Sequence, residues 1–235
     1  MNCLIADLTV KIPDTSEMTT RCKDYLTEMK RHPEIVILPE RYRHKVWPNL
    51  DQAGVEYMES GLQFYGQLLR YDGLMLHASA VEFEEKAYLF SGPSGMGKST
   101  HTKLWQQVFG PAAQVFNDDK PALRFVEGKW YAYGTPWCGK DGINQNKKVP
   151  LAGICFLKRG EENTIRELTI AEAIPSIVSQ TRRKLKDPEL GNLMLQHVEK
   201  LVTMIPVFEL HNRPEPEAAI LSCETMRKKA EEMGL

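Results

Sequence analysis

The hydrophobic residues of the chain recur with two different periods, which predict alternating strands and helices. Apolar runs and two-residue alternations are typical of strands, and they cover residues 4–12, 34–38, 74–83, 86–90, 114–116, 121–126, 129–134, 151–157 and 206–210. Apolar residues spaced three or four apart are typical of helices, and they cover residues 16–31, 58–71, 99–109, 169–181, 187–204 and 215–233. Because strands and helices follow one another along the chain, the pattern predicts an α/β fold.

The turns between the strands predict that the central β-sheet is mixed. Glu84 and Glu85 lie between two apolar runs, and Glu127 with Gly128 lies between two alternating runs. Both pairs of strands are therefore expected to be antiparallel, because parallel neighbours need a long crossover between them. We expect a small N-terminal α+β subdomain in residues 1–70 and the main domain in residues 71–235.

Composition narrows the class of protein. The 235 residues are 42% hydrophobic and 26% charged with a net charge of −1, which predicts a globular protein and indicates neither nucleic acid nor membrane as a partner. The N-terminus lacks the layout of a signal peptide, and no apolar run has transmembrane length. The five cysteines are widely spaced, which favours free thiols and a cytoplasmic location.

The run SGPSGMGKST, residues 91–100, fits the phosphate-binding pattern G-x-x-x-x-G-K-[ST]. It follows an apolar strand and opens a helix, so backbone amides would bind nucleotide phosphates. Lys98 would neutralise the β- and γ-phosphates of ATP, and Ser99 would bind Mg²⁺. The candidate nucleotide-binding residues are Gly92, Ser94, Gly95, Met96, Gly97, Lys98, Ser99 and Thr100. The alternative is a glycine turn that happens to precede Lys-Ser.

Two adjacent carboxylates, Asp118 and Asp119, follow the loop at the end of a predicted strand. Phosphoryl transfer uses carboxylates to hold metal and to position or deprotonate an attacking hydroxyl, and a pair can divide these roles. The alternative is a solvated acidic turn, which is common for Asn-Asp-Asp. The phosphate-binding pattern upstream favours the functional interpretation.

Four runs together resemble the HPr kinase/phosphorylase and phosphoenolpyruvate carboxykinase superfamily, in particular its short HPr-kinase-like proteins. They are HASAV (77–81), KAYLFSGPSGMGKST (86–100), FNDDKPALR (116–124) and YGTPWCGK (133–140). The resemblance covers residues 73–158 well and implies a main domain like the C-terminal domain of HPr kinases. It further implies that Asp118 is the catalytic base toward a serine hydroxyl, that Asp119 is associated with Mg²⁺, and that His77 lies near both. For His77 a hydrogen-bonded core histidine is the alternative.

Three further basic features are candidates for contacts with phosphate. Lys140 ends the run GTPWCGK and would steady the transferred phosphoryl group, with an exposed lysine on a structural turn as the alternative. Arg213 lies in a segment that resembles the closing motif of short HPr-kinase-like proteins, which implies a nucleotide contact. A basic run would grip a phosphate or an acidic peptide, or else form a solvated helix end. It comprises Arg182, Arg183, Lys184 and Lys186.

Together these residues predict an enzyme that uses ATP and Mg²⁺ to phosphorylate a hydroxyl, with serine expected, of a peptide, protein or small molecule. The alternatives are a phosphorylase or phosphatase acting on the phosphorylated acceptor, and a non-catalytic nucleotide-sensing module. HPr is not the expected acceptor, because the longer leading domain and the signature of true HPr kinases are not found. The resemblance also implies a homo-oligomer.

Overall fold

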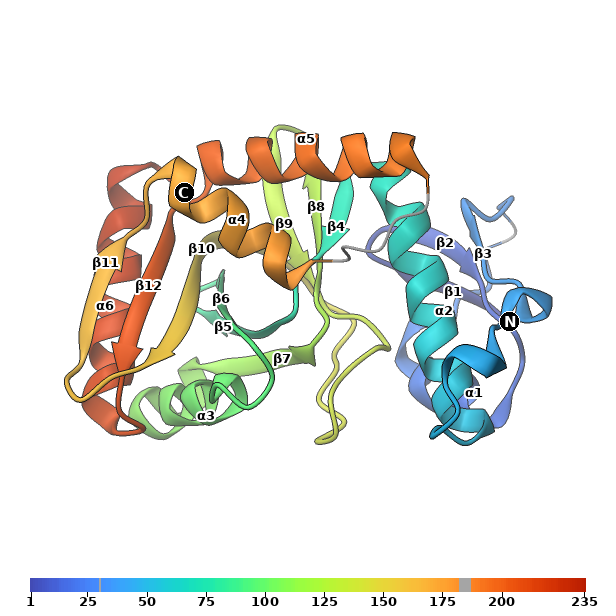
Figure 1. Ribbon diagram of the computed structural model, residues 1–235, viewed down its shortest axis with the longest axis horizontal. Helices are drawn as coiled ribbons and strands as arrows, with labels where there is room; N and C mark the ends of the chain where they lie inside the picture. The colour runs from blue at the N-terminus through green and yellow to red at the C-terminus, as the bar shows by residue number, and fades with distance from the viewer. Residues whose placement is uncertain (30, 182–186) are drawn as a thin grey trace.

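The computed structural model describes residues 1–29, 31–181 and 187–235 and has a mixed α/β architecture (Figure 1). Its strands are β1 (Asn2–Ile5), β2 (Leu8–Lys11), β3 (Ile35–Val36), β4 (Gly73–Met75), β5 (Ala78–Phe83), β6 (Lys86–Ser91), β7 (Gln114–Asp119), β8 (Ala122–Val126), β9 (Lys129–Tyr133), β10 (Lys148–Arg159), β11 (Thr164–Glu167) and β12 (Val207–Asn212). Its α-helices are α1 (Ser16–Arg21), α2 (Gln52–Leu68), α3 (Lys98–Phe109), α4 (Ile170–Gln180), α5 (Pro188–Met204) and α6 (Pro216–Glu232).

The main sheet has the strand order β4-β8-β9-β10-β6-β5-β7, with β12 beside β10 and β11 beside β12. β6 and β12 run parallel to β10, whereas the other neighbouring strands are antiparallel. This confirms the predicted mixed sheet. Because β6, β10 and β12 are parallel, their carboxyl ends lie at the same edge of the sheet, and the loop after β6 belongs to that edge.

Both predicted hairpins are confirmed, and their turns follow a common geometry. β5 pairs antiparallel with β6 across Glu84 (φ 51°) and Glu85 (φ 60°), and β8 pairs antiparallel with β9 across Glu127 (φ 49°) and Gly128 (φ 83°). Two successive residues with positive φ match the right-handed twist of the flanking strands, which is why two residues suffice for each turn.

Several predicted elements are wrong in extent, three of them markedly. The strand expected at residues 4–12 is two antiparallel strands, because Ala6 and Asp7 have positive φ and reverse the chain between β1 and β2. The helix expected at residues 16–31 ends at Arg21 and continues only as a 3₁₀ turn. The strand expected at residues 74–83 is divided into β4 and β5, which pair with different strands of the main sheet.

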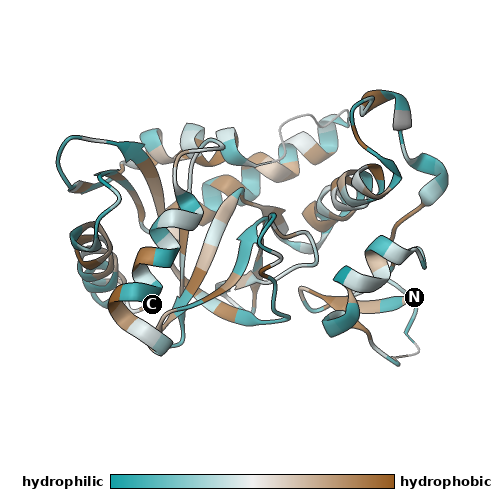
Figure 2. Ribbon diagram, turned by 90° about the horizontal axis from the view of Figure 1, so that it is seen from below, coloured by the Kyte–Doolittle hydropathy of each residue, from teal (hydrophilic) through white to brown (hydrophobic). Residues whose placement is uncertain are grey.

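The helices cover both faces of the main sheet and bury two separate hydrophobic cores. α4 and α5 contribute Ile177, Val198 and Leu201 to the core on one face, whereas α3 and α6 contribute Trp105 and Met226 to the core on the other. Figure 2 shows that the hydrophobic residues gather on the strands and on the helix faces turned toward them. Among the described residues, every helix is too short or too polar to cross a membrane.

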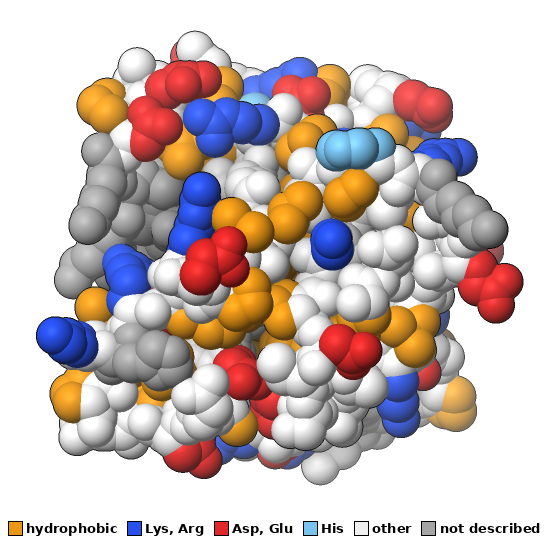
Figure 3. Space-filling model, turned by 90° about the vertical axis from the view of Figure 1, so that its right-hand side faces the viewer, with side chains coloured by type: hydrophobic (Ala, Val, Ile, Leu, Met, Phe, Trp, Pro, Cys, Tyr) orange, Lys and Arg blue, Asp and Glu red, His pale blue; other side chains and the backbone are white. Residues whose placement is uncertain are grey.

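The N-terminal strands β1–β3 form a small sheet that packs with α1 and α2 on one side of the molecule (Figure 1). The backbone groups on the open side of β3 and just after it find hydrogen-bond partners on α2. The side-chain amides of Gln67 and Gln63 bond the backbone N–H and carbonyl groups of Val36 and Leu38, respectively. The core of this N-terminal unit continues into the main sheet through Ala122 and Tyr133, and into the loop after β9 through Trp137. Its outer face carries side chains of both charge signs interspersed with hydrophobic ones (Figure 3).

Candidate phosphate-binding site

The loop of residues 92–97 joins β6 to α3, and its three glycines all adopt positive φ. The values are 148° for Gly92, 79° for Gly95 and 96° for Gly97, which residues with a Cβ rarely adopt. Gly97 is the residue that precedes α3, and it has no side chain to accept hydrogen bonds from the first turn. The first amides of α3 therefore face the loop without a side-chain cap, an arrangement suited to an anion.

Lys98, the first residue of α3, folds back onto the loop. Its Nζ donates to the carbonyl oxygens of Gly92 at 3.0 Å and Pro93 at 3.3 Å, and the residue is only 8% exposed. Burial lowers the pKa of this ammonium group, while the charges of Asp119 and Asp118 oppose that effect. An ammonium group forms stronger hydrogen bonds with an anion than with neutral carbonyl oxygens. Exchange of these two carbonyl oxygens for an anionic ligand is therefore favourable for Lys98.

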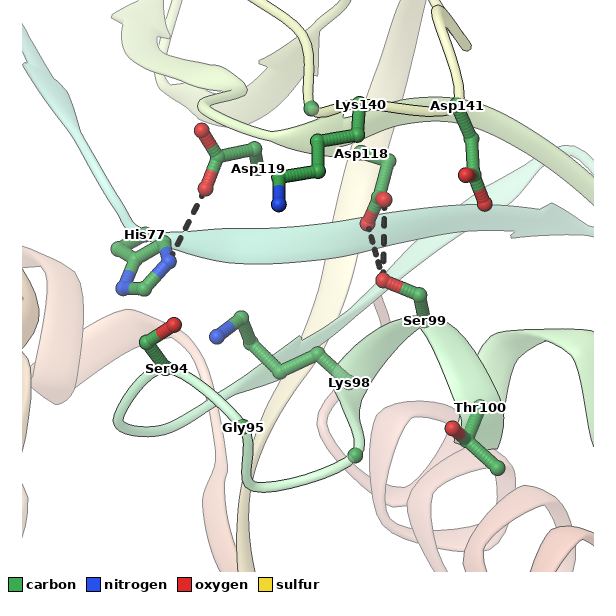
Figure 4. A pocket seen from close by; sticks show the side chains of 12 residues that line it. His77, Ser94, Gly95, Lys98, Ser99, Thr100, Asp118, Asp119, Lys140 and Asp141 are labelled. Carbon is green, nitrogen blue, oxygen red and sulfur yellow. Dashed lines mark hydrogen bonds and ion pairs between the residues drawn. The ribbon is translucent and has the colours of Figure 1, made fainter.

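Ser99 and Asp118 are in direct contact. The hydroxyl of Ser99 donates to both carboxylate oxygens of Asp118, at 2.9 and 3.1 Å, and Asp118 is buried (Figure 4). The backbone of Asp118 is fixed as well, because its N–H donates to Ile143 and its carbonyl accepts from Gly139 at 2.7 Å. The carboxylate of Asp118, near the end of β7, thus points at the first turn of α3.

Asp119 has different partners from Asp118. Its Oδ1 lies 3.0 Å from Nε2 of His77, and its Oδ2 accepts from the ammonium group of Lys120. Burial alone would raise the pKa of Asp119, but the bond from His77 and the charge of Lys120 outweigh it and hold that pKa well below its usual range. His77 is itself held from the other side, since its Nδ1 lies 3.1 Å from Oε1 of Gln180. Asp119 is therefore a fixed anion.

These groups converge on one cavity of about 500 Å³ (Figure 4). Lys140 reaches into it from the loop after β9, opposite Lys98, so that two ammonium groups and three carboxylates line the space. The lining residues are His77, Ser94, Gly95, Gly97, Lys98, Ser99, Thr100, Asp118, Asp119, Gly139, Lys140 and Asp141. Paired cations and carboxylates around a glycine loop suit a phosphate ester with a hard metal ion.

The structure brings most of the predicted site residues together, with three exceptions among the described residues. Gly92 and Met96 belong to the loop but do not line the cavity. Arg213 follows β12 at the same edge of the sheet, yet it lies outside the cavity and pairs with Glu215 at 3.8 Å. The basic run of residues 182–186 lies outside the described residues.

Sequence reasoning did not single out several residues at or beside the cavity. Gly139 and Asp141 line it, and Lys120 and Tyr57 lie directly behind Asp119. Lys120 follows the two aspartates in the sequence, so its position offered a signal. Tyr57 lies on α2, far from any motif, and nothing in the sequence pattern indicated it.

The donor set fits Mg²⁺ bound together with a nucleotide. Ser99, Asp118 and Asp119 offer hard oxygen ligands, which Mg²⁺ prefers. Within the described part of the chain no group of three or more His, Cys, Asp or Glu side chains could enclose a metal ion. That is consistent with the usual binding of Mg²⁺ through one or two protein oxygens plus substrate phosphates. The five cysteines are buried free thiols, as predicted.

Comparisons with known proteins find similarity to solved structures only. No protein-family model and no curated protein matches the sequence. The chain is similar to the HPr(Ser) kinase/phosphatase from Coxiella burnetii with 12% sequence identity and a TM-score of 0.40, over 68% of this chain and 92% of that chain. A TM-score of 0.40 is too low to transfer a fold or an activity, so the resemblance seen in the sequence stays a prediction.

Proposed function

We propose that this protein is a kinase that binds ATP with Mg²⁺ at the loop of residues 92–97 and transfers the γ-phosphoryl group to a hydroxyl. The acceptor is expected to be a serine of a peptide or protein, or the hydroxyl of a small molecule. One observation carries the proposal: Lys98, Ser99, Asp118 and Lys140 converge on a single cavity beside the uncapped start of a helix. Positioning and electrostatic stabilisation are what phosphoryl transfer mainly requires of a protein.

Each of these residues has a role in the proposal. Lys98 exchanges its carbonyl partners for phosphate oxygens, and Lys140 neutralises charge on the transferred group. Ser99 and a carboxylate would hold Mg²⁺, which when bound neutralises phosphate charge. The resemblance implies Asp119 as that carboxylate, and Asp119 lines the same cavity as Ser99.

We retain Asp118 as the residue that orients or deprotonates the acceptor hydroxyl. It already accepts hydrogen bonds from a hydroxyl, that of Ser99, through both oxygens. Asp119 is less suited to the role of base, because His77 and Lys120 stabilise its charged form and so weaken its affinity for a proton. Orientation by a carboxylate suffices for a loose transition state with little proton transfer.

The test is transfer of label from γ-³²P-ATP with Mg²⁺ into peptides and proteins encoded beside the gene. Lys98→Ala is expected to lower transfer about 100-fold or more, because a cation is lost where charge develops, and Asp118→Asn is expected to do so by a similar factor. Lys228→Ala removes an exposed lysine on α6 that does not line the cavity, and it serves as the matched control.

Label in an acceptor that disappears in both site variants and persists in Lys228→Ala supports the kinase. Full transfer by Asp118→Asn contradicts the assigned role of that carboxylate. Tight ATP binding without transfer to any acceptor contradicts the kinase and favours nucleotide sensing. Transfer of the phosphoryl group from a phosphorylated acceptor to inorganic phosphate, with pyrophosphate as the product, contradicts a kinase alone and favours the phosphorylase.

A further inference from the structure

The loop of residues 134–147, here called the site loop, carries Gly139, Lys140 and Asp141 into the cavity but is fastened to the N-terminal unit. Trp137 is fully buried against α2, where it stacks on Phe64 with ring centroids 4.7 Å apart. Its Nε1 donates to the hydroxyl of Ser60 at 3.0 Å, and its ring fills the space that a Cβ on Gly61 would occupy. The site loop therefore takes its position from α2.

Tyr57, also on α2, makes the contact nearest to the cavity. Its hydroxyl donates to the carbonyl oxygen of Cys138 at 2.9 Å, one residue before Gly139, and accepts from Nζ of Lys120 at 2.8 Å. Lys120 donates its other bond to Asp119. A single hydroxyl thus links the site loop on one side to the ion pair of Asp119 on the other.

The hydrogen bond from Tyr57 to Cys138 requires a protonated hydroxyl, and the surroundings of Tyr57 favour that form. Burial raises the pKa of Tyr57 despite the nearby ammonium of Lys120, so its hydroxyl stays protonated and remains a donor to Cys138. Arg21 of α1 covers the ring of Tyr57, with its guanidinium carbon 4.5 Å from the ring centroid.

We propose that Tyr57 and Lys120 are positioning residues of the phosphoryl-transfer site, through which the N-terminal unit sets the place of the site loop and of Asp119. The inference rests on the proposed kinase function. It makes the N-terminal unit a part of the site, since Lys140 reaches the cavity only from a loop that α2 holds. It predicts an effect on the rate of transfer and little effect on ATP affinity, because the loop of residues 92–97 does not depend on Tyr57.

The test compares Tyr57→Phe with Tyr71→Phe. Both substitutions remove one hydroxyl that donates to a backbone carbonyl, but Tyr71 bonds Glu34, next to β3, and neither residue lines the cavity. Amide hydrogen exchange of residues 134–147 and the dissociation constant for Mg²⁺-ATP are measured together with kcat and KM for transfer. Tyr57→Phe is expected to speed exchange in the site loop and to lower kcat about 10- to 100-fold, with ATP affinity within about twofold of wild type.

Lys120→Gln keeps a hydrogen-bonding group on a side chain one atom shorter and removes the charge, and it is expected to give the same split between kcat and ATP affinity. Tyr71→Phe is expected to resemble wild type in all four measurements. Wild-type kcat in Tyr57→Phe and Lys120→Gln overturns this inference alone, and so does loss of ATP affinity equal to the loss of kcat. Absence of transfer by the wild-type protein overturns the proposed function, and this inference with it.

Discussion

Asp118 and Asp119 are neighbours in the chain, yet their carboxylates lie in opposite surroundings. Asp118 accepts from a neutral hydroxyl, whereas Asp119 pairs with His77 and Lys120. Asp119 has φ 95°, and unlike the positive-φ residues of the two hairpin turns it ends a strand at the site. Non-glycine residues pay for such a backbone conformation, which persists only where surrounding contacts enforce it. The contacts of Asp119 with His77 and Lys120 enforce it here.

Substituting each aspartate in turn separates stability from function. Asp119→Asn removes the negative charge that faces Lys120 and His77, and it is expected to lower the free energy of unfolding at neutral pH by about 1–3 kcal/mol. Asp118→Asn keeps an acceptor for the hydroxyl of Ser99 and is expected to change it by less than about 1 kcal/mol. Urea denaturation checks both, and equal destabilisation by the two variants would contradict the division between them.

The helix that faces the cavity is fixed by buried polar pairs. Thr102 of α3 lies 3.0 Å from the hydroxyl of Ser79 on β5, and His101 lies 3.0 Å from the hydroxyl of Ser222 on α6. The same Ser222 hydroxyl accepts from Nε1 of Trp105 at 2.9 Å. Hydrogen bonds depend on direction and distance, so α3 and its N-terminus cannot shift relative to β5 and α6 without losing these bonds.

His101 predicts a pH dependence of stability. Burial lowers its pKa from the ordinary 6.5 to about 4, so between these values the unfolded chain binds a proton that the folded protein does not. The free energy of unfolding should therefore fall as the pH falls from about 6.5 to 4, by about 3 kcal/mol in total from this residue.

Urea denaturation at a series of pH values measures the effect of His101. His101→Gln, which keeps a hydrogen-bonding side chain without a titrating ring, should flatten the curve in this range. An unchanged slope in His101→Gln would show that other groups cause the dependence.

The site loop is joined to the N-terminal unit where the ring of Trp137 packs into a slot beside Gly61 and Phe64 of α2. A Cβ on Gly61 would lie 2.9 Å from Cδ1 of this ring, whereas a Cβ on Gly191 in α5 would meet nothing within 4 Å. The contact is tight because Trp137 also packs on Phe64 and Tyr65. The N-terminal unit and the site loop are thus expected to unfold together.

Matched glycine substitutions test the slot. Gly191→Ala is expected to stabilise the protein by about 0.5–1 kcal/mol, because alanine is the better helix former. Gly61→Ala brings the same gain in helix propensity but displaces Trp137, and it is expected to destabilise the protein by about 1–3 kcal/mol. Thermal unfolding compares the two, and stabilisation by Gly61→Ala would show that the slot can widen freely.

Elements were predictable from the sequence where local pattern determines them. The helix after Gly97 and the hairpin turns at Glu84–Glu85 and Glu127–Gly128 follow from residues that are adjacent in the chain. The division of residues 74–83 between β4 and β5 could not be predicted, because an apolar run has the same pattern whichever strands it pairs with. The same holds for the early end of α1, where packing outweighs a helical pattern.

The sequence alone indicated a glycine loop, a lysine and serine at the start of a helix, and two carboxylates, since each lies within a short run whose chemistry is local. Only the tertiary structure decided that Ser99 contacts Asp118 rather than Asp119, and that a tyrosine of the N-terminal unit supports the site. Tyr57 lies 63 residues from Lys120 and 81 from Cys138 in the chain. Contacts at such separations depend on how helices and strands pack, and no local periodicity encodes them.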